Sequence, residues 1–183
     1  MSVVDDLVAA YRHRVNLPLR SNLSPAERVW IAVYPPEQER RLRHRLDELA
    51  IVTSEAGLAW RTVDVTDSFG TWLAAHEYRE AYLRRPERLT SAALESFADE
   101  VVRQVDAELI EVDDRTVVAL VGTGALYPFV RASRVIEGVE ASIRGRLLVF
   151  FPGRLDGTSF RLLDARDGWN YRATPITATK DGS

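Results

Sequence analysis

The sequence predicts an α/β fold: a single three-layer domain with a mainly parallel β-sheet flanked by helices, of the Rossmann-like or degenerate P-loop-like kind. Segments with strand periodicity alternate with segments of helical periodicity along most of the 183-residue chain. In addition, the segments 113–124 and 145–151 contain continuous apolar runs, which are typical of strands buried on both faces of a sheet. We expect one domain over residues 1–176 and a disordered tail over residues 177–183.

The first third of the chain offers two helices and two strands. Apolar residues between positions 7 and 11 predict a short N-terminal helix. RVWIAVY at 28–34 predicts a strand that ends at a double proline. The stretch 37–50 carries its leucines on one face, as an amphipathic helix does, and residues 58–67 alternate like a strand.

The alternation continues through the rest of the chain. The expected elements are, in order, a helix over 69–85, a helix capped by Thr90 or Ser91 that runs to Leu109, a strand within 113–124, a helix within 126–143, a strand over 145–151, and short strands within 159–164 and 171–176. Strands that alternate with helices in this way favour a parallel sheet.

The composition excludes several classes of protein. Cysteine is absent, which excludes disulfides and thiolate metal sites and suits a cytoplasmic protein. No apolar window is long enough to span a membrane, and the N-terminus is acidic before it is basic, the reverse of a signal peptide. A net charge of −3 gives no overall attraction to nucleic acid or anionic lipid. We expect a cytoplasmic protein that does not associate with membranes.

The loops that follow the strands are the expected place for a site, because the carboxyl ends of parallel strands share one edge of the sheet. YPPE at 34–37 fails as a phosphate-binding loop, since its prolines lack N–H donors and Glu37 repels phosphate. GTGALYPF at 122–129 has Tyr127 where a dinucleotide fingerprint needs a third glycine. We interpret its glycines as a tight turn, with Pro128 in the first turn of the next helix. No cofactor is predicted.

A hydrolase would need a metal site or a nucleophile with its base. Asp64, Asp67 and Asp156 could gather at the sheet edge around a divalent cation, but acids are common at strand ends and their spacing matches no metal motif. The histidines are isolated, and we interpret His76, which lies among aromatic residues, as packed or capping. No catalytic residue and no metal are predicted, and a cryptic metal- or nucleotide-dependent hydrolase stays the alternative.

Arginines are concentrated at 40–45 and at 84–88. Acidic residues lie close to both groups, and Glu37 and Arg41 are spaced for an ion pair on a helix. We interpret both groups as solvated surfaces, so that contact with DNA is indirect or weak. An accessory DNA-binding subunit is the second alternative.

Three stretches of the second half, in this order, resemble the BrxB family of bacterial BREX phage-defence systems. They are GTGALYPFVR at 122–131, FPGRLDGTSFRL at 151–162 and NYRA at 170–173, and YPPEQE at 34–39 fits the family as well. The chain departs from the family at Arg154 and Leu155, where the family usually has an acid and an aromatic residue.

This resemblance implies a small cytoplasmic component, without a recognised activity, of a multi-protein system that methylates host DNA and blocks phage replication. The implied partners are a PglZ-type alkaline-phosphatase-like protein, an AAA+ ATPase and a DNA methyltransferase. We therefore expect a non-catalytic adaptor, not an enzyme, that takes part in phage resistance through protein–protein interaction.

Residues within the resembling stretches divide into two groups. Those expected to shape the backbone are Gly122, Gly124, Pro128, Pro152, Gly153, Gly157 and Asn170. Those expected to contact partners are Tyr127, Phe129, Arg131, Arg154, Asp156, Arg161, Tyr171 and Arg172. Core packing of the aromatic residues, and pairing of Arg161 with Asp164 or Asp167, are the structural alternatives. We also expect Pro152-Gly153 to end the central strand and open a rigid loop.

Overall fold

A computed structural model describes residues 2–18, 20, 22–162 and 169–178. The elements are, in chain order, α1 (Val3–Val15), η1 (Ala26–Arg28), β1 (Val29–Tyr34), η2 (Pro36–Gln38), α2 (Glu39–Arg43), α3 (Leu46–Glu55), β2 (Ala59–Asp64), α4 (Ser68–Ala75), α5 (Arg79–Arg84), η3 (Pro86–Arg88), α6 (Ser91–Ile110), β3 (Thr116–Val121), η4 (Thr123–Leu126), α7 (Ala132–Val139), η5 (Glu140–Ser142), β4 (Arg146–Asp156), β5 (Ser159–Leu162), β6 (Trp169–Asn170) and β7 (Thr174–Thr177).

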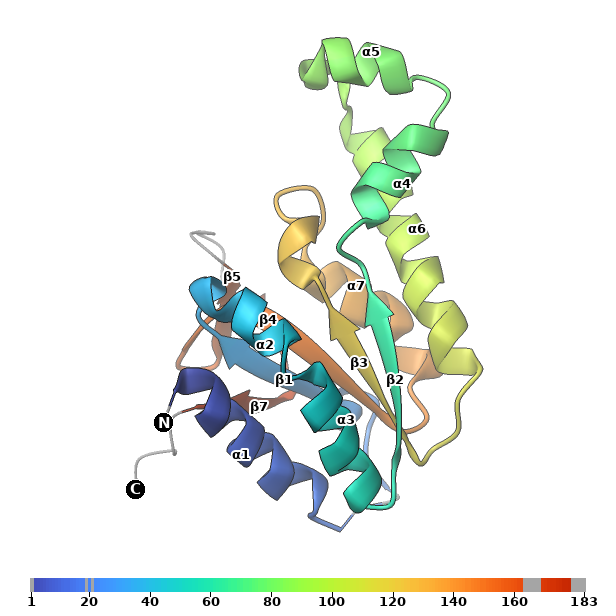
Figure 1. Cartoon of the computed structure of the whole chain (residues 1–183). Helices are drawn as coiled ribbons and strands as arrows, with labels where there is room; N and C mark the ends of the chain where they lie inside the picture. The colour runs from blue at the N-terminus through green and yellow to red at the C-terminus, as the bar shows by residue number, and fades with distance from the viewer. Residues whose placement is uncertain (1, 19, 21, 163–168, 179–183) are drawn as a thin grey trace.

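The core of the fold is a parallel sheet with the strand order β2-β3-β4-β1-β7 (Figure 1). β4 lies at its centre and pairs in parallel with β1 on one side and with β3 on the other. β5 and β6 extend the sheet from the far end of β4 in antiparallel pairing. The predicted α/β class is confirmed, although the order differs from the 3-2-1-4-5-6 order of a classical dinucleotide-binding fold.

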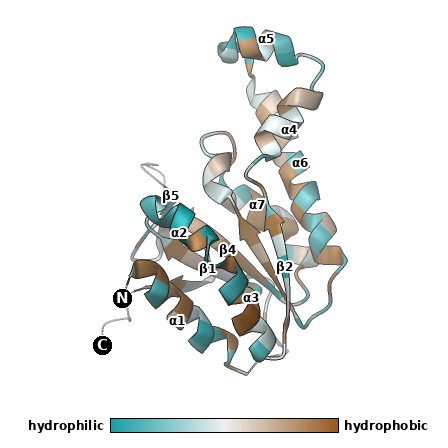
Figure 2. Cartoon of the chain, in the orientation of Figure 1, coloured by the Kyte–Doolittle hydropathy of each residue, from teal (hydrophilic) through white to brown (hydrophobic). Residues whose placement is uncertain are grey.

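Helices cover both faces of the sheet, and side chains alternate between the two faces as strand geometry requires. In β1, Val29, Ile31 and Val33 pack under α6 and α7, whereas Trp30 and Tyr34 pack under α1, α2 and α3. Figure 2 shows the resulting contrast between apolar strands and helices whose outer faces are polar. Among the described residues, none of the helices has the length and apolar character needed to cross a membrane.

An arm made of α4, α5 and η3 projects beyond the carboxyl edge of the sheet (Figure 1). The sequence predicted one helix over 69–85, and this was wrong because the backbone is extended at His76. The ring Nδ1 of His76 accepts a hydrogen bond from the backbone N–H of Tyr78 at 3.1 Å, which favours a turn over a continuing helix. The predicted cap at Thr90 is confirmed, since its hydroxyl accepts from the N–H of Ala93 at 3.2 Å.

Two further predicted helices have different bounds. The stretch 37–50 forms α2 and α3, which are separated at His44 and Arg45. α7 begins only at Ala132, so Pro128 does not lie in its first turn; Pro128 instead follows a cis peptide bond within the loop. At the C-terminus β7 includes Thr177, and residues 179–183 lie outside the described part of the chain.

The predicted end of the central strand at Pro152-Gly153 is wrong. β4 continues to Asp156 and forms a β-hairpin with β5 through a two-residue turn, Gly157-Thr158. Gly157 has a φ of +59°, which the first position of such a turn requires. Gly153 is needed for a different reason: a Cβ there would lie 2.1 Å from the carbonyl oxygen of Arg161 on β5. Both glycines therefore belong to the hairpin.

Replacement of Gly153 by alanine is expected to lower the free energy of unfolding by about 1–3 kcal/mol, because the new methyl group must push β5 away from β4. Gly70→Ala is the matched control, since no atom lies within 4 Å of a Cβ at this position in α4. The control is expected to raise stability by up to about 1 kcal/mol, because alanine favours the helix. Urea denaturation of both variants measures the difference, and equal midpoints for Gly153→Ala and the parent would contradict the close approach.

Candidate functional site

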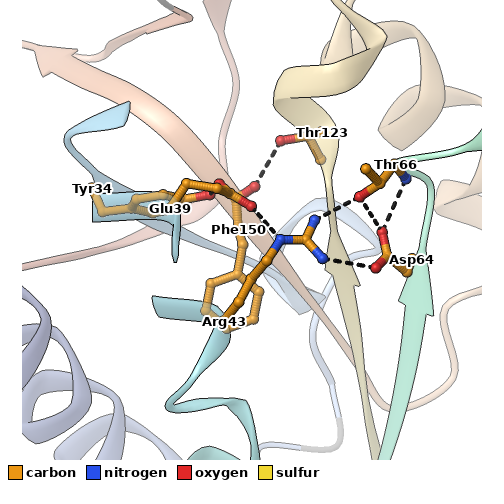
Figure 3. Close-up of polar contacts among 7 residues, drawn as sticks. All are labelled: Tyr34, Glu39, Arg43, Asp64, Thr66, Thr123 and Phe150. Atoms are coloured by element: carbon orange, nitrogen blue, oxygen red, sulfur yellow. Dashed lines mark hydrogen bonds and ion pairs between the residues drawn. The ribbon is translucent and has the colours of Figure 1, made fainter. Parts of the chain in front are cut away.

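The carboxyl edge of the sheet holds a network of polar side chains centred on Arg43 of α2 (Figure 3). Arg43 Nε donates to Glu39 Oε1 at 2.8 Å, and its Nη1 donates to Asp64 Oδ2 at 2.8 Å. Its Nη2 donates to the hydroxyl of Thr66 at 2.6 Å. One guanidinium therefore connects the helix after β1 to the end of β2.

The loop after β3 closes against this network. Gly122 has a φ of +83°, and a Cβ there would lie 2.4 Å from the hydroxyl oxygen of Thr66 and 2.8 Å from Asp64 Oδ1. The next residue, Thr123, donates its hydroxyl to the carbonyl oxygen of Phe150 on β4 at 2.7 Å (Figure 3). Gly122 is thus required by its backbone conformation and by the close contact.

The network sets the protonation of two of its members. Partial burial raises the pKa of Asp64, but hydrogen bonds from Arg43 and Thr66 outweigh burial and hold this pKa below its ordinary value. For Tyr34, burial raises the pKa of the phenol, and the hydrogen bond it donates to the Glu39 carboxylate raises it further. Asp64 is therefore a carboxylate and Tyr34 a neutral phenol at pH 7.

Two of the three carboxylates expected at this edge have partners within the chain, whereas Asp67 lies at the start of α4 without capping it through its side chain. Asp64 binds Arg43 and Thr66, while Asp156 lies 2.9 Å from Arg161 Nε. Across residues 2–18, 20, 22–162 and 169–178, no group of three or more acidic or histidine side chains is arranged to hold a metal ion. His76 packs between Trp72 and Tyr82, at ring-centroid distances of 4.8 and 5.1 Å, which favours the packed interpretation of this histidine.

The arginines at 40–45 are also largely compensated. Arg43 binds two carboxylates, and Arg45 binds Asp5 and Glu48. Arg41 lies 3.9 Å from Asp5, which is distant from it in the sequence, whereas helical spacing had indicated Glu37 as its partner. This supports the interpretation of the segment as a set of ion pairs on a solvated surface.

The first two family-resembling stretches meet in space. A Cβ at Gly124, in the loop after β3, would lie 2.9 Å from Pro152 Cγ on β4. Phe129 stacks on Phe69 of α4 with ring centroids 4.0 Å apart and planes within 8°. Phe129 therefore supports the base of the arm, while Tyr127 of the same loop leaves 42% of its surface exposed.

Charged side chains on the hairpin pair with one another. Asp156 lies between Arg154, with an Nε–Oδ2 distance of 3.4 Å, and Arg161, at 2.9 Å. Arg154 and Arg161 are cross-strand neighbours, so both guanidinium groups can reach the same carboxylate. The partner of Arg161 is thus Asp156; Asp164 and Asp167 lie outside the described residues.

The third resembling stretch runs from the hairpin back to β7. Asn170 pairs with Ser159 through the backbone of β6. Tyr171 packs against the core under α6 and α7; burial raises the pKa of its phenol, as does the nearby Glu140 carboxylate. Arg172 is exposed. All three stretches therefore contribute to the same side of the sheet.

The predicted contact residues divide by exposure. Phe129 and Tyr171 are partly buried against the core, and Arg161 is only 34% exposed. The exposed group consists of Tyr127, Arg131, Arg154, Asp156 and Arg172. We call these five residues the exposed motif residues.

A comparison with known protein families agrees with the resemblance carried by the three stretches. A family model described as BREX protein BrxB matches residues 63–176, more than half of the chain. The chain belongs to the BrxB family. The resemblance inferred from the three stretches is confirmed, and the protein is a component of BREX phage-defence systems. Neither a curated protein nor a solved structure gives a match.

The BrxB match runs from the end of β2 into β7, with the loop after β3 and the hairpin inside it. Arg43 and Glu39 lie before the matched region, in a helix whose partners only the fold reveals. One of the contacts of Arg43 was visible in the sequence, because Glu39 and Arg43 have the i,i+4 spacing of a helical ion pair. The contact between Arg43 and Asp64 has no signal in the local sequence.

Replacing Arg43 by glutamine is expected to lower the free energy of unfolding by about 1 kcal/mol at pH 7, because Glu39 and Asp64 lose their shared partner while remaining partly solvated. The folded-state pKa of Asp64 is depressed, so this stabilisation is present above its unfolded pKa and is lost as the pH falls through the folded value. The difference between the two proteins should therefore shrink below about pH 4.

Arg103→Gln is the control, since Arg103 is 71% exposed and pairs with Glu100 on the same helix. We expect this control to change stability by less than about 0.5 kcal/mol. Urea denaturation over a pH series provides the measurement. A deficit of Arg43→Gln that stays constant from pH 7 to pH 3 would show that the ion pair with Asp64 is not its cause.

Proposed function

We propose that this BrxB-family protein is a non-catalytic adaptor that joins other components of a BREX assembly and so supports host DNA methylation and phage exclusion. One observation carries the proposal. The polar side chains around Arg43 at the carboxyl edge, where an α/β enzyme would place its reacting groups, bond to one another within the chain. Tyr127 and Arg131 lie in the segment after β3, and Arg154 and Asp156 lie at the end of β4; like Arg172, these residues present exposed side chains to solvent.

The chemistry of the exposed motif residues suits a protein interface. Tyrosine and arginine are the side chains that most often anchor such interfaces. Arg154 is 66% exposed and Asp156 is 49% exposed, so the hairpin presents its charges to solvent. Arg131 and Arg172 add positive charge against the single Asp156, which favours an acidic surface on the partner.

The proposed partners are the PglZ-type alkaline-phosphatase-like protein, the AAA+ ATPase and the DNA methyltransferase of the same system, in the cytoplasm where these proteins act on DNA. Pro152, Gly153 and Gly157 support this role indirectly, because they fix the hairpin that carries Arg154 and Asp156. Contact with DNA would then pass through the partners. The compensated arginines of α2 agree with such an indirect contact.

The double variant Tyr127→Ala/Arg154→Glu is expected to reduce co-purification of the partner proteins at least tenfold and to restore phage plating, because it removes an exposed aromatic group and reverses an exposed charge. Arg12→Glu on α1 is the matched control, since Arg12 is 50% exposed and α1 packs on the face of the sheet opposite to the one on which Phe160 and Leu162 of the hairpin pack. Unchanged association and unchanged defence in the double variant would rule out this surface.

Absence of turnover is the second expectation. Incubation of the purified protein with ATP or an aryl phosphate and Mg²⁺ or Mn²⁺ should release no phosphate, because Asp64 is held by Arg43, whose charge repels a cation. The measurement is phosphate release over time, compared with an Asp64→Asn variant that keeps the shape of the side chain. Release by the parent that disappears in Asp64→Asn would contradict the non-catalytic role.

A further inference from the structure

The amino edge of the sheet, opposite the network of Arg43, contains two adjoining cavities of about 440 and 590 Å³. Both are lined by Arg20 and Arg146, so they form one recess at the beginning of the strands. Arg146 is the first residue of the central strand β4. We call the six arginines of this recess the amino-edge arginines: Arg14, Arg20, Arg28, Arg115, Arg144 and Arg146.

Arg146 is buried and forms no ion pair with a carboxylate of residues 2–18, 20, 22–162 and 169–178. The residue is only 6% exposed, and the central carbon of its guanidinium lies 5.7 Å from the centre of the Trp30 ring. Nη1 donates to the carbonyl oxygen of Gly145 at 2.9 Å, whereas Nε is buried with no hydrogen-bond acceptor. Burial lowers the pKa of this guanidinium, and the charge of Arg28 lowers it further. A buried charge in this state is destabilising unless something else compensates it.

The other amino-edge arginines are likewise not neutralised by carboxylates. Within the described part of the chain, none of the six forms an ion pair with a carboxylate. Arg28 and Arg115 donate to backbone carbonyl oxygens, of Ile143 at 2.7 Å and of Gly57 at 2.8 Å. These contacts fix the direction of both guanidinium groups without neutralising them.

Three carboxylates also line the recess, but they do not balance it. They are Glu27, Asp113 and Asp114, against six arginines, which leaves a net charge of +3 in a chain whose total is −3. Glu27 Oε2 accepts from Ser24, and Asp113 Oδ1 accepts from Thr116, so one oxygen of each of these two carboxylates is already engaged. The C-termini of α1 and α6 lie near the recess and add only about half a negative charge each. A positive excess remains.

We propose that this recess binds a phosphoryl group of a small ligand, with Arg146 as the recessed contact and Arg144 and Arg20 at the rim. A guanidinium fork matches phosphate oxygens, and a phosphoryl group carries enough negative charge to use several arginines at once. A terminal phosphate can enter the recess as far as Arg146, whereas the backbone of a DNA duplex would touch only exposed arginines. The recess is separate from the hairpin of Arg154 and Asp156, because Arg146 begins β4 and the hairpin lies at the end of the same strand.

Calorimetric titration with inorganic pyrophosphate tests the proposal on the full chain. The parent protein is expected to bind, Arg146→Met to bind at least tenfold more weakly, and Arg144→Gln to bind measurably more weakly. Arg103→Gln, an equal charge change on the exposed face of α6, should bind like the parent. Without ligand, Arg146→Met should melt at the same or a higher temperature than the parent, because it removes an uncompensated buried charge. A purely structural Arg146 would give a lower melting temperature.

A parent protein that does not bind pyrophosphate, or an Arg146→Met variant that binds it equally well, would overturn the proposal. If Arg146→Met does not fold, the rim variant decides: unchanged affinity in Arg144→Gln has the same consequence. A short DNA duplex is titrated in parallel. Duplex binding that is weakened by Arg144→Gln and kept in Arg146→Met would assign the arginines to a nucleic-acid backbone and also overturn the small-ligand site.

Discussion

The central strand β4 is the element on which the rest of the structure depends. From Arg146 to Phe151 it is buried on both faces, and it is held in parallel pairing by β1 and β3. Beyond this segment the same strand leaves β1 and pairs with β5. One continuous backbone therefore carries the buried guanidinium at its beginning and the exposed hairpin at its end. Any displacement of β4 would alter both ends of the molecule together.

The arginines at the two edges of the sheet differ in whether carboxylates compensate their charge. At the carboxyl edge each guanidinium of Arg43 and Arg45 meets carboxylates of the same chain, so the charges cancel locally and the side chains are fixed. At the amino edge the arginines meet carbonyl oxygens and an aromatic ring, which orient them but leave their charge in place. Compensated charge fixes side chains within a fold, whereas uncompensated charge that is held in position is suited to recognition.

Much of the fold follows from periodicity in the sequence. The buried strands, the helix after Thr90 and the sheet class were all predictable, because burial on two faces and capping leave local signals. The continuation of β4 was not. Pro152 lacks an N–H and normally marks a strand end, but here it pairs with Tyr34 at the point where the partner of β4 changes to β5. That Pro152 can lie inside a strand is apparent only from the pairing of β4 with β1 and β5.

Sites assembled from residues far apart in the sequence were harder to predict. The spacing of Glu39 and Arg43 is visible in the sequence, but their link to Asp64 and Thr66 depends on how β2 follows α3. The amino-edge arginines extend from Arg14 to Arg146 and share no spacing, so no sequence pattern groups them. The family-resembling stretches were easier to recognise because each lies within a dozen consecutive residues.

The position of β1 has a consequence for biosynthesis. β1 emerges early from the ribosome, yet both of its neighbours, β4 and β7, belong to the last quarter of the polypeptide. At a translation rate of about 10 residues per second, the nascent VWIAVY segment waits roughly ten seconds for a partner. During that interval a fully apolar, β-prone segment is open to chaperones and to other nascent chains. Efficient production of this protein therefore depends on how well the cell shields its first strand until the last ones are made.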